Sequence, residues 1–240
     1  MECKVSDKLE QQLIYNKLDK NSHKMITDYK NLTINKYLEI KDILNDDGGE
    51  LNIQSRIISC LADMDLDDVL NLSLTRYNEL AQKTAFLMEK PKLTGRIPNK
   101  LNINGRECTI TKNVNKLTAA QYIDYQTLTA QEDSDKYIAA VIACFIVPVG
   151  FTYGDGYDVQ EIAEWLGDNL SILDALNVCF FFRKKYLDLI KRTLVYLELR
   201  MRMIRTKKET PEIQMKMKEL KKMIHQYRMI IQESGDGLLW

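Results

Sequence analysis

Histidines, cysteines and clustered acids are the side chains of this sequence with the greatest potential for chemistry. Histidine is the usual proton carrier near neutral pH, but His23 and His225 lie far apart, in segments whose patterns predict surface helices. No serine or cysteine stands in a nucleophile-elbow pattern or beside a patterned histidine. The sequence identifies no catalytic residue, and we predict that the protein is not an enzyme.

Acidic side chains are the most plausible ligands for a metal ion. They gather between Asp63 and Asp68, and Asp155 and Asp158 flank glycines in a later loop. A calcium-binding loop needs further oxygen ligands at fixed spacing and a closing glutamate, which this loop lacks. The glycine runs match neither a P-loop nor a dinucleotide fingerprint. We expect helix caps and loops here, with no metal site and no cofactor, although paired carboxylates stay an open alternative.

The five cysteines are scattered and odd in number, and most of them stand within apolar runs. Such thiols are typical of small buried side chains in a reducing compartment, not of a disulfide framework or a metal site. They are Cys3, Cys60, Cys108, Cys144 and Cys179.

Charge is balanced over the whole chain but separated by region. Residues 183–228 carry 15 Lys or Arg against 5 Asp or Glu, whereas residues 121–170 carry 9 acids against the single Lys136. The basic residues fit the solvated face of an amphipathic helical pair, which could also dock on the acidic units. The alternative is a contact surface for an acidic partner, nucleic acid included. Aromatic residues do not interleave the basic run as base-stacking proteins require.

Two helix starts share one pattern about 85 residues apart, the scale expected of an internal repeat. Leu32-Thr33 and Leu117-Thr118 both precede an aliphatic helix, and each threonine is placed to be an N-cap. Gln121 adds a capping box in the second copy. In both copies we then expect an acidic loop, an apolar helix, a short helix and a Ser-capped helix. In the second copy, Pro148 is expected to end the apolar helix.

A β-hairpin is predicted between the two copies. Residues 100–111 alternate in polarity around Asn104-Gly105, and this pair best tolerates the positive φ angles of a type I′ turn. The expected class is therefore mainly α: a duplicated helical unit with one small β-hairpin between the copies and a long C-terminal helical hairpin. We expect residues 1–31 as an N-terminal arm or helix, 32–90 as helical unit 1, 91–116 as a linker with the β-hairpin, 117–182 as helical unit 2, and 183–240 as the long helical hairpin and apolar tail, the two units packing as one domain.

The C-terminal helices carry apolar residues at heptad spacing. Between Leu187 and Ile204 the steps are 3-4-3-4-3, and between Ile213 and Ile231 they are 4-3-4-3-4. Two adjacent seams joined by a short turn predict an antiparallel helical hairpin, or pairing with other subunits. The expected protein-contact residues are the seam and the apolar tail: Leu194, Leu197, Met201, Ile204, Ile213, Met217, Leu220, Ile224, Tyr227, Leu238, Leu239 and Trp240.

These features together resemble morphogenesis proteins of tailed bacteriophages that infect Bacteroidetes-type hosts, and more loosely helical tail assembly chaperones. The resemblance covers residues 32–185 and is carried by folding motifs. They are Leu117-Thr118 with Gln121-Tyr122-Ile123-Asp124-Tyr125-Gln126, the apolar segment ending in Ile146-Val147-Pro148, Tyr157-Asp158, Phe180-Phe181-Phe182 and Asn104-Gly105.

The resemblance implies a non-enzymatic structural or assembly protein, such as a minor virion, tail or connector-region component or a tail assembly chaperone. Its partners would be other phage proteins, with the chain itself a homo-oligomer or ring neighbour. Its location would be the host cytoplasm during assembly and, for a virion component as opposed to a chaperone, also the virion. No membrane contact is expected, because the longest apolar stretch is too short to span a bilayer. The alternative is a small nucleic-acid-associated or regulatory protein that uses the basic C-terminal hairpin.

Overall fold

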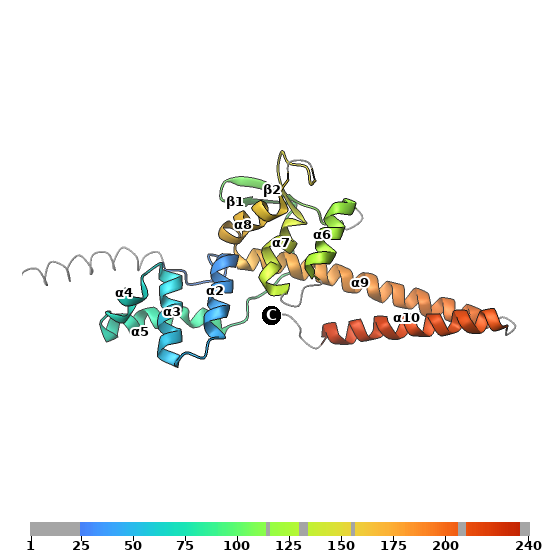
Figure 1. Ribbon diagram of the computed structural model, residues 1–240, viewed down its shortest axis with the longest axis horizontal. Helices are drawn as coiled ribbons and strands as arrows, with labels where there is room; N and C mark the ends of the chain where they lie inside the picture. The colour runs from blue at the N-terminus through green and yellow to red at the C-terminus, as the bar shows by residue number, and fades with distance from the viewer. Residues whose placement is uncertain (1–24, 114–115, 130–133, 155–156, 206–209, 236–240) are drawn as a thin grey trace, which may run out of the picture. The chain divides into compact units, whose positions relative to one another are not determined.

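The computed structural model describes residues 25–113, 116–129, 134–154, 157–205 and 210–235 (Figure 1). The chain divides into two units between Asn177 and Val178, a boundary that falls within one continuous helix. The structure is mainly helical with one small antiparallel sheet and a long helix near the C-terminus, so the predicted fold class is confirmed.

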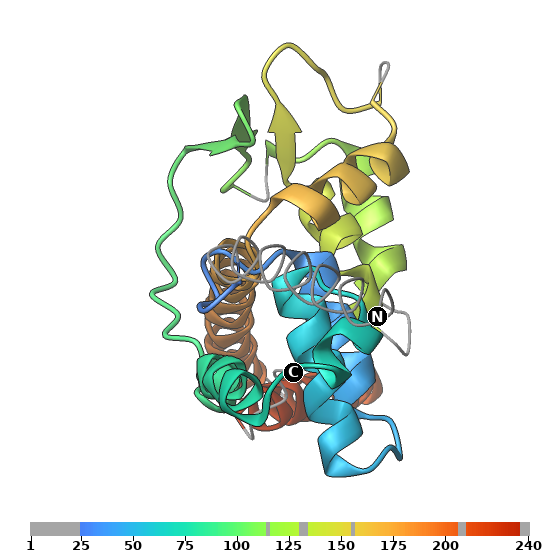
Figure 2. The ribbon, with the colours of Figure 1, turned by 90° about the vertical axis from the view of Figure 1, so that its left-hand side faces the viewer.

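The first unit contains α2 (Ile34–Leu44), α3 (Glu50–Ala62), α4 (Leu66–Leu70), α5 (Leu74–Lys83), the 3₁₀ helix η1 (Thr84–Met88), β1 (Lys100–Ile103), β2 (Arg106–Ile110), α6 (Ala119–Thr129), the 3₁₀ helix η3 (Ser134–Tyr137), α7 (Ile138–Ala143), β3 (Ile146–Pro148), α8 (Val159–Asn169) and the start of α9 (Ile172–Arg205). The second unit contains the rest of α9 and α10 (Pro211–Gly235). Figure 2 shows the extended segment that joins η1 to β1.

The threonine caps predicted from the repeat are present. The Thr33 hydroxyl accepts a hydrogen bond from the Lys36 N–H at 3.4 Å, and the Thr118 hydroxyl accepts one from the Gln121 N–H at 3.2 Å. The Gln121 side-chain oxygen accepts the Thr118 N–H at 2.8 Å, which completes the capping box. Gln121 is buried and also donates to the Cys144 carbonyl at 3.0 Å, so this cap ties α6 to the end of α7.

The two predicted copies share an order of helices but not their lengths. In order, α2, α3, α4 and α5 correspond to α6, α7, α8 and α9. However, α3 has 13 residues against 6 in α7, and α4 has 5 against 11 in α8. That the two copies superpose in three dimensions stays a prediction.

The starts of α2 and α9 are joined by backbone hydrogen bonds. The Ile34 N–H donates to the Leu170 carbonyl at 3.2 Å, and the Ile172 N–H donates to the Leu32 carbonyl at 2.7 Å. The two residues between them form an antiparallel bridge. All four aliphatic side chains are at most 2% exposed. Two helix N-termini, which have free N–H groups, are thereby fixed to each other in the core of the first unit.

The predicted β-hairpin is present with its predicted turn. Asn104 and Gly105 have φ angles of 46° and 80°, as a type I′ turn requires. The Asn104 amide donates to the Asn169 side-chain oxygen at 2.8 Å, and the Arg106 guanidinium lies 4.9 Å from the ring centre of Trp165. The hairpin is thus fastened to α8 at both its turn and its second strand.

The apolar helix of the second copy is shorter than predicted, and the expectation that Pro148 ends it is wrong. The helix α7 ends at Ala143, and Ile146–Pro148 forms strand β3, which pairs antiparallel with β2. The β-branched Ile146 and Val147 favour a strand. Proline is tolerated there because β3 is an edge strand of the β1-β2-β3 sheet.

Helices α2 and α8 approach each other closely at Gly167. Gly167 is buried, and a Cβ atom at this position would lie 2.5 Å from the side-chain oxygen of Asn35. The Asn35 amide donates to the Asp168 carboxylate at 2.7 Å. A glycine is therefore required for the two helices to approach with this hydrogen bond intact.

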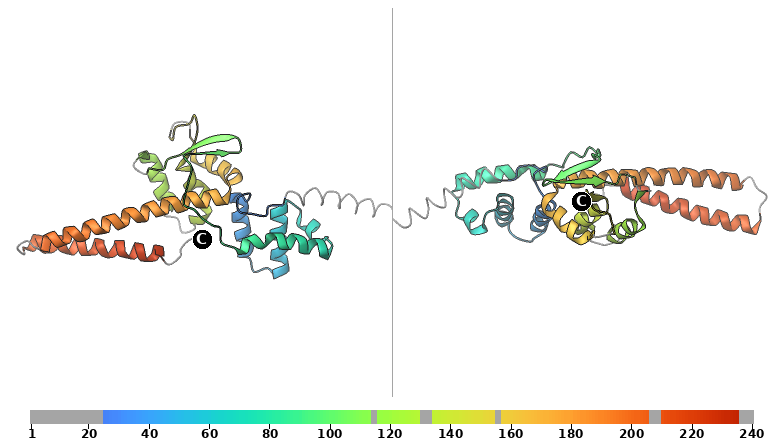
Figure 3. Two further views of the ribbon diagram at one scale, coloured as in Figure 1. Left: turned by 180° about the vertical axis from the view of Figure 1, so that it is seen from behind. Right: turned by 90° about the horizontal axis from the view of Figure 1, so that it is seen from above.

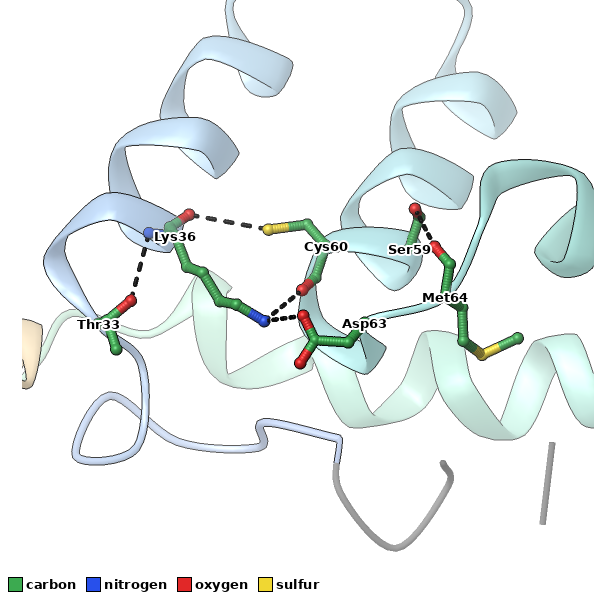
Figure 4. Close-up of polar contacts among 6 residues, drawn as sticks. All are labelled: Thr33, Lys36, Ser59, Cys60, Asp63 and Met64. Atoms are coloured by element: carbon green, nitrogen blue, oxygen red, sulfur yellow. Dashed lines mark hydrogen bonds and ion pairs between the residues drawn. The ribbon is translucent and has the colours of Figure 1, made fainter. Parts of the chain in front are cut away.

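Lys36 links α2 to the end of α3 (Figure 4). Its ammonium donates to the Cys60 carbonyl at 3.1 Å and pairs with the Asp63 carboxylate. Asp63 ends α3 in the left-handed conformation, with a φ of 50°. The Cys60 thiol, 8% exposed, faces the Lys36 carbonyl at 3.9 Å. Burial, and next the nearby Glu39 carboxylate, raise the pKa of this thiol to about 12.

Gly167→Ala is expected to lower the free energy of unfolding by about 1–2 kcal/mol, because the Asn35 amide must move away from Asp168. Urea unfolding followed by circular dichroism measures this loss. In an Asn35→Ala background the obstacle is gone, so the same substitution should be neutral or stabilising through helix propensity. An equal loss in both backgrounds would contradict this account of the contact.

Alkaline pH is expected to destabilise the fold through Cys60. In the unfolded chain the thiol ionises near the ordinary pKa of 9.0, whereas in the folded chain it does so near about 12. Because the folded pKa is the higher one, the stabilisation is full below pH 9.0 and is lost as the pH rises toward about 12.

Between about pH 8 and about pH 10.5, the wild type should therefore lose more unfolding free energy than Cys60→Ala does. The difference between the two losses should be on the order of 1–2 kcal/mol. Subtracting the pH-dependent change in unfolding free energy of the variant from that of the wild type removes the contribution of lysines and tyrosines, which both proteins share. Identical pH dependence in the two proteins would show that the Cys60 thiol is not shielded in the folded state.

Candidate protein-contact surface

The acidic residues singled out in the sequence lie at helix ends in the structure. Asp65 precedes α4, and Asp158 caps α8 by accepting the N–H groups of Gln160 and Glu161 at 2.8 and 3.3 Å. Among the described residues, no three His, Cys, Asp or Glu side chains are placed to hold a metal ion. His225 is exposed on α10, while His23 and Asp155 lie outside the described residues.

A buried tyrosine–cysteine cluster lies where α6, α7 and the loop after β3 meet. The Tyr153 hydroxyl donates to the Asp124 carboxylate at 2.7 Å and lies 3.9 Å from the Cys144 sulfur. Its ring centre is 4.9 Å from that of Tyr157, whose hydroxyl donates to the Ala143 carbonyl at 2.7 Å. Burial raises the pKa of the Cys144 thiol to about 11 and also raises the pKa values of both tyrosines. A thiol held protonated is a poor nucleophile, and the hydrogen bonds of the two tyrosines link α6, the end of α7 and the loop after β3.

The second unit is built around the predicted heptad seam. Helices α9 and α10 lie side by side in both views of Figure 3. Its centre is formed by Leu197, Leu220 and Ile224, each at most 6% exposed. Partly buried hydrophobic residues from both helices pack around them: Leu194, Met201, Ile204 and Tyr227. The hairpin's own helices therefore cover this part of the seam, which needs no neighbouring subunit for burial.

The remaining predicted contact residues have a mixed outcome. Ile213 and Met217 are half-buried on α10. The apolar tail of Leu238, Leu239 and Trp240 lies outside the described residues. Helix α10, which carries Ile213 and Met217, begins with a capped proline: the Thr210 hydroxyl accepts the Ile213 N–H at 3.3 Å, and Pro211 is the first residue of the helix. Across the seam, the Arg228 guanidinium donates to the Glu198 carboxylate at 2.7 Å.

A second set of apolar residues is exposed on α9, away from the seam. These side chains are 50–60% exposed. The five between Tyr186 and Leu199 are called the outer stripe: Tyr186, Leu189, Val195, Tyr196 and Leu199. Met203, 60% exposed, follows them along α9. Leu189, Arg192, Tyr196 and Leu199 follow each other at steps of 3, 4 and 3 residues, which is the heptad spacing of a helix-pairing face. Since the seam already occupies one side of α9, this helix carries helix-pairing patterns on two sides.

Charged side chains lie within and beside the outer stripe. Arg192, within it, and Arg200 and Arg202, beside it, are exposed, and Asp188 is half-buried. The exposed surface of α10 is basic as well, with Lys218, Lys221 and Lys222. An apolar helical stripe with a charged border is the usual composition of a protein contact that exchanges water for a partner helix.

The outer stripe was missed from sequence because the seam alone satisfied the heptad pattern. Its signal was nevertheless present, since large apolar residues remain on α9 after the seam positions are removed. A single amphipathic helix leaves few such residues.

Leu197→Ala is expected to loosen the hairpin, whereas Leu199→Ala is expected to leave it intact. The first substitution opens a cavity in the seam and should cost about 2–4 kcal/mol, while the second shortens an exposed side chain and should stay within about 0.5 kcal/mol. Hydrogen–deuterium exchange of α10 peptides measures both, with exchange accelerated only by Leu197→Ala. Equal acceleration by the two variants would contradict the assignment of seam and outer faces.

None of the helices in the described ranges is both long enough and apolar enough to cross a membrane. Comparison of the chain with protein-family models, curated proteins and solved structures found no significant match. The hairpin itself carries the features that bear on function: a closed seam, an exposed apolar stripe and a basic border.

Proposed function

We propose that this protein is a non-enzymatic structural or assembly protein of a tailed bacteriophage and that it acts through protein–protein contact. One observation carries the proposal: α9 exposes a heptad-spaced apolar stripe after its seam has been covered by α10. Exposed apolar helix faces of this kind are costly in water and are typical of surfaces that a partner covers. The phage context rests on the sequence resemblance of residues 32–185.

The chemistry of the described residues supports contact as the mode of action. Asp158 caps α8 and Asp63 pairs with Lys36, and burial raises the pKa values of the Cys60 and Cys144 thiols to about 12 and about 11. Large rigid aromatic residues dominate interface energetics, and bordering charges mainly steer the encounter. The outer stripe provides both, because it contains Tyr186 and Tyr196 and has arginines beside it.

The double variant Tyr196→Glu/Leu199→Glu is expected to abolish incorporation into phage particles without unfolding the protein. Glutamates in the outer stripe would have to be buried unpaired at the contact. Complementation of a gene-deleted phage, followed by mass spectrometry of purified particles, measures incorporation. Circular dichroism melting checks the fold.

Met215→Glu is the matched control, because Met215 is 60% exposed on α10, outside the outer stripe. It adds a similar charge and should leave incorporation unchanged. Normal particles from the stripe variant, or equal loss from both variants, would overturn the proposed function.

A nucleic-acid-associated protein is the second candidate. It is favoured by Lys218, Lys221 and Lys222, which are all exposed on α10. Binding to phosphates through such lysines falls steeply with salt. Fluorescence anisotropy with duplex and single-stranded DNA at low and high salt would support this candidate if binding is salt-sensitive and is lost in the Lys→Glu triple variant.

A further inference from the structure

We infer that the outer stripe is covered by the same stripe of a second copy of this chain, with the two α9 helices antiparallel. This inference rests on the proposed function and names the first partner of the contact surface. It is carried by the order of residues along α9. With this order, the stripes of two copies complement each other when the helices are antiparallel, but not when they are parallel.

The core residues of the stripe match those of a second copy when the two α9 helices are antiparallel. The two-fold axis then crosses the outer face of α9 at the level of residue 194, whose own side chain lies in the seam. In antiparallel coiled coils each core position faces the complementary core position of the partner. Leu189 then faces Leu199 of the second copy, and Arg192 faces Tyr196, with both contacts repeated by symmetry. An arginine over a tyrosine ring is a favourable cation–π arrangement.

The border residues pair in the same register. On one side, Val195 faces Val195 across the axis, and the Asp188 carboxylate faces the guanidinium of Arg202. On the other side, Tyr186 faces Arg200. Each of the five residues of the outer stripe thus faces a residue of the second copy. The only acid on this border, Asp188, faces the basic Arg202.

The parallel arrangement fails on charge. In parallel coiled coils each core residue faces its own copy, so Arg192 would face Arg192 at the centre of the contact. Two guanidinium groups taken out of water side by side repel each other strongly. Charge complementarity therefore selects the antiparallel pairing, and with it a closed dimer in place of an open chain of copies.

Light scattering after size-exclusion chromatography is the first measurement. The full-length chain should be a dimer at tens of micromolar, a range in which modest interfaces associate. Asp188→Arg and Arg202→Asp should each weaken the dimer by about five- to tenfold, because each places like charges opposite one another. The double variant Asp188→Arg/Arg202→Asp restores opposite charges and should return to within about threefold of the wild type.

Crosslinking tests the register directly. Val195→Cys places two thiols across the two-fold axis, so a short bismaleimide should join two copies in high yield. Met215→Cys, at a site on α10 that is 60% exposed, and the wild type should give little crosslinked dimer.

A chain that remains monomeric, or a double charge variant that is no better than the single ones, would overturn the antiparallel dimer. If the stripe glutamates still abolish particle incorporation, the proposed function stands and the occupant is another protein with an acidic helix. If the dimer forms but the glutamate variant is incorporated normally, the dimer stands and the proposed function fails.

Discussion

The pairing of two helix starts is the constraint on which the first unit depends. Leu32 and Ile34 precede and begin α2, Leu170 and Ile172 do the same for α9, and two backbone hydrogen bonds hold these starts together. Free N–H groups at helix ends are costly when buried. One such group from each helix is satisfied by a carbonyl that precedes the other helix, so the aliphatic residues at both starts can be buried. The remaining contacts of α2, to α3 through Lys36 and to α8 past Gly167, follow from that fixed position.

Helix α9 belongs to both units, because the boundary between Asn177 and Val178 falls within it. Asn177, the last residue of the first unit, accepts hydrogen bonds from the Thr94 and Gly95 N–H groups at 2.9 and 3.2 Å. Beyond it, α9 continues with neither glycine nor proline, so its helical hydrogen bonds run uninterrupted into the hairpin. The helix that carries the outer stripe in the second unit therefore begins among buried residues of the first.

Sequence reasoning succeeded where the determining interactions are local. The caps at Thr33 and Thr118 and the turn at Asn104-Gly105 depend on residues within a few positions, and each is present. It failed at Ile146–Pro148, because a short apolar run has no periodicity that separates strand from buried helix. The partner that decides the matter, β2, is distant in sequence. The bond between the starts of α2 and α9 was missed for the same reason. The outer stripe was missed because one heptad pattern on α9 concealed the other.

The two-sided pattern of α9 restricts how the length of the hairpin can vary between related chains. Adding or removing one residue rotates everything beyond it by about 100° around the helix axis. Such a change would move Leu197 out of the seam and shift Tyr196 and Leu199 from the outer stripe at the same time. Inserting or deleting a whole heptad in α9 preserves both faces of the helix. The seam stays aligned only when α10 gains or loses the same number of residues. Insertions and deletions in this hairpin should therefore occur in matched blocks of about seven residues.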